Sequence, residues 1–64
     1  MMSIYDLMNM FCDGDMQVIN LFELYSGESV YCGEYGDMPD EFQDVEVSSI
    51  DNLDGNVLVI NIEL

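Results

Sequence analysis

Apolar residues near the start of the chain are spaced as on one face of a helix. They recur at positions i, i+3, i+4 and i+7. They are Ile4, Leu7, Met8 and Phe11. Ser3, followed by Asp6 three residues later, is typical of a helix start, because each side chain can accept a hydrogen bond from the other residue's backbone N–H. The segment Asp13-Gly14-Asp15 is expected to end this helix.

Four apolar runs further along have the length and composition of β-strands. They cover residues 17–24, 30–34, 45–50 and 57–64. Ser26-Gly27 supplies a turn between the first two runs, and Asp54-Gly55 is a hairpin signal between the last two. Pro39 and the acids around it predict a short second helix over residues 37–42, because Pro and acidic residues are favoured in a first helical turn. Met38 and Phe42 are expected to face inward.

The order of these elements, α-β-β-α-β-β, predicts a single α+β domain over residues 1–64. Its natural form is a four-stranded, mostly antiparallel sheet with one longer and one short helix packed on one face. A chain of 64 residues has room for one thin core. Half of the residues are hydrophobic, which favours a folded domain over disorder.

Alternation along the last strand predicts which of its side chains face the core. Leu58, Ile60, Ile62 and Leu64 form the set expected to face inward, and they alternate with Val57, Val59, Asn61 and Glu63. The open face of the sheet is expected to be partly apolar. In one of the possible strand registers, this face carries Ile19, Leu21, Tyr31, Tyr35, Val57 and Val59. A face of this kind is often covered by a partner or by a second copy of the chain.

The charge of the chain changes this picture most. There are 14 Asp and Glu residues and no Lys, Arg or His, which gives a formal net charge of −14. No side-chain salt bridge can form, and the folded state must tolerate repulsion among its carboxylates. We therefore expect the negative field itself to be used, in binding a basic protein. Direct nucleic-acid binding is excluded, because it needs Lys and Arg to neutralise phosphates.

The densest charge lies in residues 34–46, where six acids are interleaved with Tyr35, Met38 and Phe42. Tyr and Met are enriched in the cores of protein interfaces. The predicted partner-binding residues are Glu34, Tyr35, Asp37, Asp40, Glu41, Asp44 and Glu46. The alternative interpretation is a solvated loop and short helix, with the Phe in the core and the acids in water.

The number of acids is comparable to the number of phosphates in a DNA segment of the same size. A compact domain of this length has a radius of gyration of roughly 11 Å and hence a diameter near ~27–28 Å. Duplex DNA carries one charge per ~1.7 Å, so this length of duplex holds about 16 charges. The chain's 14 acids give a similar density.

Metal-binding and catalytic sites are disfavoured. Asp13-Gly14-Asp15 and residues 51–56 carry closely spaced oxygen ligands, but neither has the Glu that a Ca²⁺ loop needs at its twelfth position. Cys12 and Cys32 have no histidine or cation to activate a thiol. We therefore expect no metal, no cofactor and no enzymatic activity.

The cysteines and the hydropathy suggest where the protein acts. Cys12 and Cys32 fit a reducing compartment as small buried residues with free thiols, and a disulfide between them is the alternative. The chain has no basic start of the kind found in secretory signals, and no run of ~18 apolar residues. A cytoplasmic protein that stays off membranes is expected.

In size and charge the chain resembles the small acidic inhibitor proteins of phages and mobile elements, among them DNA-mimic anti-restriction proteins and several anti-CRISPR proteins. The resemblance rests on the length, the absence of basic residues and the acidic and aromatic segment 34–46. It implies a protein that blocks a nuclease or another nucleic-acid-binding enzyme by filling its cationic groove. The alternative is a structural or adaptor module that self-associates, as a homodimer for example, or docks through its sheet face.

Overall fold

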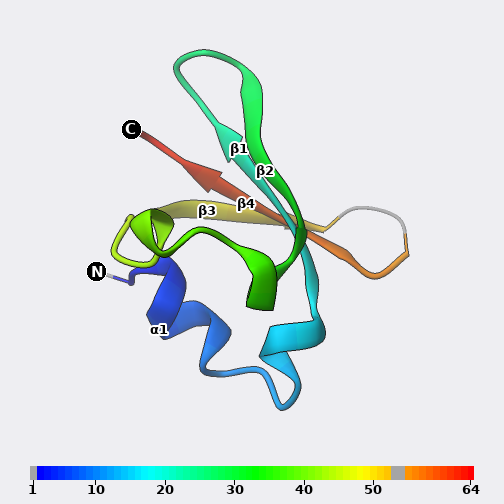
Figure 1. The fold of residues 1–64 in the computed structure, drawn as a ribbon. Helices are drawn as coiled ribbons and strands as arrows, with labels where there is room; N and C mark the ends of the chain where they lie inside the picture. The colour runs from blue at the N-terminus through cyan, green and yellow to red at the C-terminus, as the bar shows by residue number, and fades with distance from the viewer. Residues whose placement is uncertain (1, 53–54) are drawn as a thin grey trace.

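A four-stranded sheet forms most of the regular secondary structure (Figure 1). The computed structural model describes residues 2–52 and 55–64. In this part of the chain the regular elements are α1 (Ile4–Met8), β1 (Val18–Glu23), β2 (Glu28–Glu34), β3 (Val47–Asn52) and β4 (Val57–Ile62). Three 3₁₀ turns lie in the connections: η1 (Gly14–Met16), η2 (Tyr35–Asp37) and η3 (Asp40–Phe42). The predicted α+β class and its four strands are confirmed.

The middle pairing of the sheet is parallel. The strand order is β2-β1-β4-β3, with β1 antiparallel to β2, β3 antiparallel to β4, and β1 parallel to β4. The predicted mostly antiparallel sheet matches the two outer pairings, but the parallel central pair was not predicted, and the sheet is mixed. The two most apolar strands, β1 and β4, take the central positions, because these remove more apolar surface from water than the edges do. The turn predicted at Asp54-Gly55 includes residue 54, which lies outside the described residues.

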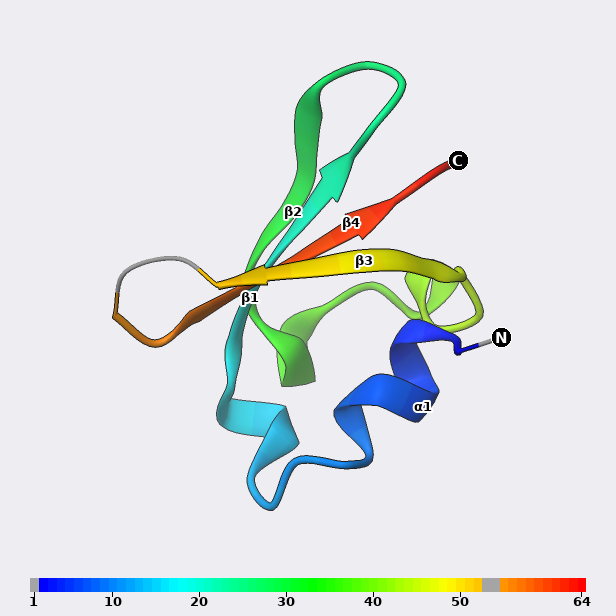
Figure 2. The same ribbon diagram turned by 180° about the vertical axis from the view of Figure 1, so that it is seen from behind.

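The parallel pairing determines the path of the chain between the two hairpins. Because β2 and β3 are each antiparallel to a central strand, they run in the same direction at opposite edges of the sheet. The connection between them is the twelve-residue segment 35–46. Connections between parallel strands need about a dozen residues or more. In Figures 1 and 2 this crossover lies on the same side of the sheet as α1.

The predicted second helix over residues 37–42 is replaced by two 3₁₀ turns, η2 and η3. Met38 and Pro39 separate them in an extended conformation, with ψ values of 136° and 139°. The cause is local, because the ring of a proline disfavours the helical conformation for the residue before it. The prediction that Met38 and Phe42 face inward is confirmed, since Met38 is buried and Phe42 is partly buried against the core.

The first helix begins where the sequence predicts and ends earlier. The Ser3 hydroxyl accepts a hydrogen bond from Asp6 N at 3.1 Å, and the Asp6 carboxylate accepts one from Ser3 N at 3.5 Å. The helix ends at Met8, so Phe11 lies outside it and is exposed. The chain turns back tightly onto the helix end: a Cβ at Gly14 would lie 2.6 Å from the Met8 carbonyl oxygen. This return leaves no space for another helical turn.

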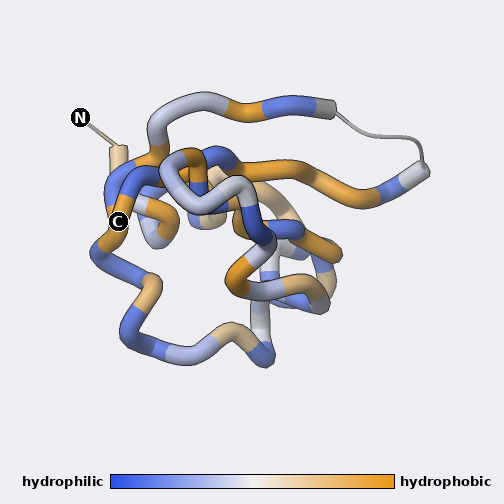
Figure 3. The backbone as a smooth tube through the Cα atoms, turned by 90° about the horizontal axis from the view of Figure 1, so that it is seen from above, coloured by the Kyte–Doolittle hydropathy of each residue, from blue (hydrophilic) through white to orange (hydrophobic). Residues whose placement is uncertain are grey.

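The core lies between one face of the sheet, called here the core face, and the layer formed by α1 and the crossover. Its buried residues are Ile4, Leu7, Met8, Ile19, Leu21, Tyr35, Met38, Ile60 and Ile62. The residues Val57, Leu58, Val59 and Ile60 of β4 form a continuous hydrophobic stretch in the tube of Figure 3. Ile60 and Ile62 face the core as predicted, and Leu58 packs partly buried against it. Leu64 lies past the end of β4 and is exposed, which corrects its predicted inward position.

The side chains of β1 that face the core are not the ones predicted. Ile19 and Leu21 were expected on the open face, but both are fully buried in the core, and Tyr35 is buried with them. The open face of β1 instead carries Val18 and Phe22, which are half-buried. Since apolar residues occupy both faces of this strand, alternation alone does not distinguish the two registers.

Glu23 is the one buried acid in the described part of the chain. Its carboxylate accepts hydrogen bonds from the backbone N–H groups of Tyr25 at 3.1 Å, Ser26 at 2.7 Å and Leu64 at 3.2 Å. These bonds, led by the one from Ser26, lower the pKa of Glu23 from 4.5 to about 2. The carboxylate thus joins the turn after β1 to the segment after β4.

Truncating Leu21 tests the position of the core. Leu21→Ala is expected to cost about 2–5 kcal/mol of unfolding free energy, as fully buried leucines do. Leu64→Ala, which shortens an exposed leucine, is expected to stay within about 0.5 kcal/mol of the parent. Urea unfolding followed by circular dichroism measures both. A cost below about 1 kcal/mol for Leu21→Ala would place this side chain on the solvent side of the sheet.

Neutralising Glu23 tests its hydrogen bonds. Because folding lowers the pKa of Glu23, the ionised carboxylate stabilises the fold above pH 4.5, and this contribution is lost as the pH falls toward about 2. Glu23→Gln is therefore expected to be less stable than the parent at neutral pH, with a difference that shrinks through this window. Urea unfolding across the pH range measures it. Glu28→Gln, at the exposed residue paired with Glu23, is the control, and an equal loss in both variants would contradict the assignment.

Candidate functional site

The end of β2 and the crossover carry the densest group of exposed acids. We call this group the acidic ridge, and its members are Glu34, Asp37, Asp40, Glu41, Asp44 and Glu46. All six side chains are exposed. Tyr35 and Met38 anchor the same segment in the core, and Phe42 packs against it. Because these apolar side chains turn inward to cover the sheet, the acids between them are left on the outside.

Tyr35 differs from the other predicted partner-binding residues. It is only 8% exposed, and its hydroxyl donates a hydrogen bond to Gln43 Oε1. Burial raises the pKa of Tyr35. Its ring therefore contributes to the core and is not presented to a partner. The prediction of an aromatic anchor within the ridge is corrected, while the six acids lie on the surface as a binding site requires.

The fold adds acids to the ridge that the sequence did not place there. The turns η1 and η2 pack against each other: Tyr35 N donates to the Gln17 carbonyl at 2.9 Å, and a Cβ at Gly36 would lie 3.0 Å from the Asp15 carbonyl oxygen. The exposed carboxylates of Asp13 and Asp15 consequently extend the negative surface beyond the crossover. In sequence these residues indicated only a turn, because their distance from the ridge along the chain hides their proximity.

Exposed acids are not confined to the ridge. Of the thirteen acids in the described residues, twelve are exposed, with Glu23 as the exception. The field acts on tyrosines in different parts of the molecule. Glu63 raises the pKa of Tyr25 and accepts a hydrogen bond from its hydroxyl at 3.3 Å. Burial raises the pKa of Tyr31, and the nearby carboxylates of Asp37 and Glu34 raise it further.

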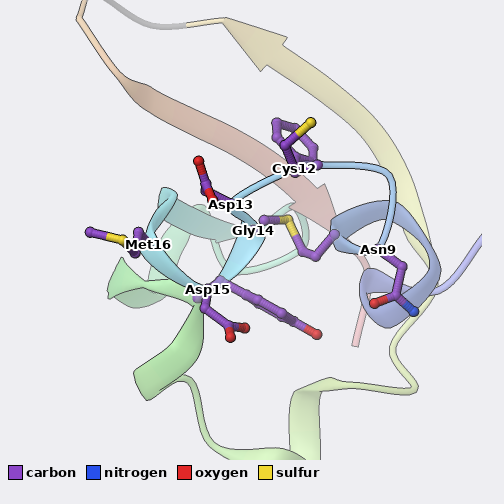
Figure 4. Close-up of a pocket in the computed structure, with 9 residues that line it drawn as sticks. Asn9, Cys12, Asp13, Gly14, Asp15 and Met16 are labelled. Atoms are coloured by element: carbon purple, nitrogen blue, oxygen red, sulfur yellow. The ribbon is translucent and has the colours of Figure 1, made fainter.

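A hollow of about 360 Å³ lies beside the loop that joins α1 to η1 (Figure 4). The side chains of Cys12, Asp15 and Met16 on its border point in different directions. Within residues 2–52 and 55–64, no group of three or more Cys, Asp or Glu side chains is placed to hold a metal ion. The same residues contain no helix long and apolar enough to cross a membrane.

Both cysteines have free thiols and are exposed. The prediction that they are buried is therefore wrong. Cys12 lies in the loop after α1, and Cys32 lies on the edge strand β2 opposite Asn20. An edge strand and a surface loop leave a small side chain in contact with solvent.

The face of the sheet opposite the core, called here the open face, carries a groove of about 350 Å³. It is lined by Asn20, Phe22, Leu24, Asp51, Val59 and Asn61. The amide of Asn61 donates hydrogen bonds to Ser49 Oγ at 2.9 Å and to Asp51 Oδ2 at 3.1 Å. Of the open-face residues predicted from sequence, Val59 lines the groove and is 7% exposed. Val57 lies on the same face of the sheet, paired with Val18.

Screening the charges tests their mutual repulsion. Raising NaCl from about 0.01 M to about 0.1 M shortens the Debye length from ~30 Å to ~10 Å. The longer value spans the whole molecule, whose greatest extent is 30 Å. The melting temperature is expected to rise, by about 4–8 °C for each 1 kcal/mol of repulsion relieved.

The control for this experiment is a variant with fewer ridge charges, Asp40→Asn with Glu41→Gln. It is expected to melt higher than the parent at low salt and to gain less from added salt. A parent melting temperature that stays constant or falls with NaCl would mean that repulsion among the carboxylates does not limit stability.

Comparisons of the chain with protein-family models, with curated proteins and with solved structures found no match. The resemblance to DNA-mimic inhibitors therefore stays a prediction from size and charge. The fold and the surface of this chain are the basis for any functional assignment.

Proposed function

We propose that the chain is an acidic inhibitor protein that acts in the cytoplasm by binding the basic, nucleic-acid-binding surface of an enzyme. The type is that of DNA- or RNA-mimic proteins such as anti-restriction and anti-CRISPR inhibitors. One observation carries the proposal: twelve carboxylates are exposed in the described part of a chain that contains no cationic side chain. A partner of opposite charge gains from every one of these groups and finds no like charge to oppose it.

The dimensions support mimicry of a nucleic acid. The principal extents of the molecule are 30 × 25 × 19 Å, and its radius of gyration is 10.6 Å. A duplex DNA segment as long as the greatest extent carries about 18 charges. The chain carries 14 acids, so its charge per length approaches that of the ligand it would replace.

The ridge is suited to this role because it is held in place before binding. Tyr35 and Met38 fix the crossover to the core, and the backbone N–H groups of Ile4 and Tyr5 donate to the carbonyls of Val45 and Gln43 at 2.9 and 3.1 Å. A surface that is already ordered loses little conformational entropy when a partner binds. Its field would also steer a basic partner toward it and raise the association rate.

In this proposal the chain is not an enzyme. It acts by occupying the nucleic-acid-binding surface of its partner. In the alternative reading, a structural or adaptor module docks through an apolar sheet face. Of the residues on which that reading relied, Ile19 and Leu21 are buried in the core. Val57 and Val59 do lie on the open face. Self-association would also bring two chains of charge −14 together.

A pull-down from nuclease-treated host lysate tests the proposal. The tagged chain is expected to retain a basic nuclease or other nucleic-acid-binding protein, identified by mass spectrometry. High salt or added DNA or RNA should release it, because both compete for the same cationic surface. Retention of a partner that is indifferent to salt and to nucleic acid would contradict the proposal.

Two matched variants test whether the ridge makes the contact. Asp40→Lys with Glu41→Lys reverses two ridge charges, and Glu28→Lys with Glu63→Lys makes the same net change elsewhere. The ridge variant is expected to weaken binding about tenfold or more, by a larger factor than the control. Equal losses would mean that the partner responds to net charge alone.

A further inference from the structure

The groove on the open face has no role in the contact proposed for the ridge. Both α1 and the crossover pack on the core face, and no described helix or 3₁₀ turn lies over the open face (Figures 1 and 2). Phe22 is half-buried in it, and Val59 and Asn61 are 7% and 8% exposed. Its floor is therefore formed before any partner arrives, as in a preorganised binding site.

Three chemical groups meet in this groove. Phe22 and Val59 supply an aromatic ring and an aliphatic floor, and Asp51 supplies an exposed carboxylate. Asn61 donates to one oxygen of Asp51, Oδ2, at 3.1 Å, which orients the carboxylate. A carboxylate accepts several hydrogen bonds, so Asp51 has capacity left for a donor from outside the chain.

The surrounding charge defines the occupant further. Glu34 at the end of β2 pairs with Val18 on this face, and Asp51 lies on β3, so each edge strand of the sheet carries an acid here. The chain has no cation of its own to neutralise them. A second copy of the chain would bring its own acids against these, which disfavours it as the occupant.

Among cationic side chains, arginine fits these groups best. Its methylene stem packs on apolar surface, its planar guanidinium stacks on an aromatic ring, and its paired N–H donors match a carboxylate. Lysine supplies the charge without the plane or the paired donors.

We propose that the groove around Phe22, Val59 and Asp51 binds an arginine side chain of a basic partner. The inference rests on the proposed function for the identity of that partner, and on the groove alone for the choice of arginine. The molecule measures 19 Å along its shortest axis. A cationic channel that encloses a nucleic acid can therefore reach the ridge on one side and the groove on the other.

An NMR titration of the ¹⁵N-labelled chain tests the groove directly. The probe is a short capped arginine peptide, and a lysine peptide of equal length and charge is the control. We expect shifts at Phe22, Asp51 and the side-chain amide of Asn61, with the arginine peptide bound about threefold more tightly. Shifts confined to the ridge, or equal affinity of the two peptides, would overturn the inference.

Variants separate the groove from the general negative charge. Asp51→Asn is expected to weaken the arginine peptide about tenfold, and Asp37→Asn, with the same change in net charge, less than about twofold. Phe22→Leu is expected to abolish the preference for arginine over lysine, and Phe22→Tyr to keep it. Circular dichroism verifies that each variant is folded. Equal effects of Asp51→Asn and Asp37→Asn would overturn the inference.

The remaining outcomes distinguish this inference from the proposed function. Sedimentation of the free chain as a dimer that Phe22→Leu dissociates would assign the groove to self-association and overturn the inference. Binding of the arginine peptide in the groove, together with a pull-down that yields no partner displaced by nucleic acid, would support the groove and reject the proposed function. Peptide binding at the ridge alone would reject the groove and leave the proposed function standing.

Discussion

The parallel pairing of β1 with β4 is the constraint on which the rest of the structure depends. It places the two most apolar strands side by side in the centre of the sheet, and it directs the two edge strands the same way. The chain must then cross one whole face to connect those edges. That crossover covers the core with Tyr35 and Met38 and places the acids of residues 34–46 outside. The exposed position of these acids is thus a consequence of the crossover that connects the two edge strands.

A chain without cations has few means of offsetting its own repulsion. The structure keeps twelve of its thirteen described acids in solvent, where water screens them. Glu23 is the exception, and it is stabilised by three backbone N–H donors in place of a countercharge. A buried carboxylate is tolerated when its oxygens are hydrogen-bonded in this way. The fold therefore satisfies its one buried acid locally and leaves the others available to a partner.

Local features of the structure could be predicted from the sequence, and long-range ones could not. The cap formed by Ser3 and Asp6 and the two hairpins depend on neighbouring residues, and they are found as expected. The helix predicted over residues 37–42 from Pro39 and the nearby acids was wrong, although the extended conformation of Met38 before the proline also has a local cause. The parallel pairing of β1 with β4 could not be predicted from the sequence, because it depends on packing between strands that are distant along the chain. For the same reason the proximity of Asp15 to the crossover emerged only from the fold.

The two faces of the molecule offer a partner different chemistry. The ridge presents carboxylates without an exposed aromatic ring, because Tyr35 is in the core. The open face presents few acids but places Asp51 beside Phe22 over an apolar floor. Charge alone steers many basic proteins toward the ridge and discriminates poorly among them. A groove that binds the planar guanidinium and the methylene stem of an arginine adds the discrimination among partners that charge lacks. A basic channel that surrounds the molecule would engage both, whereas a flat basic surface would meet only one.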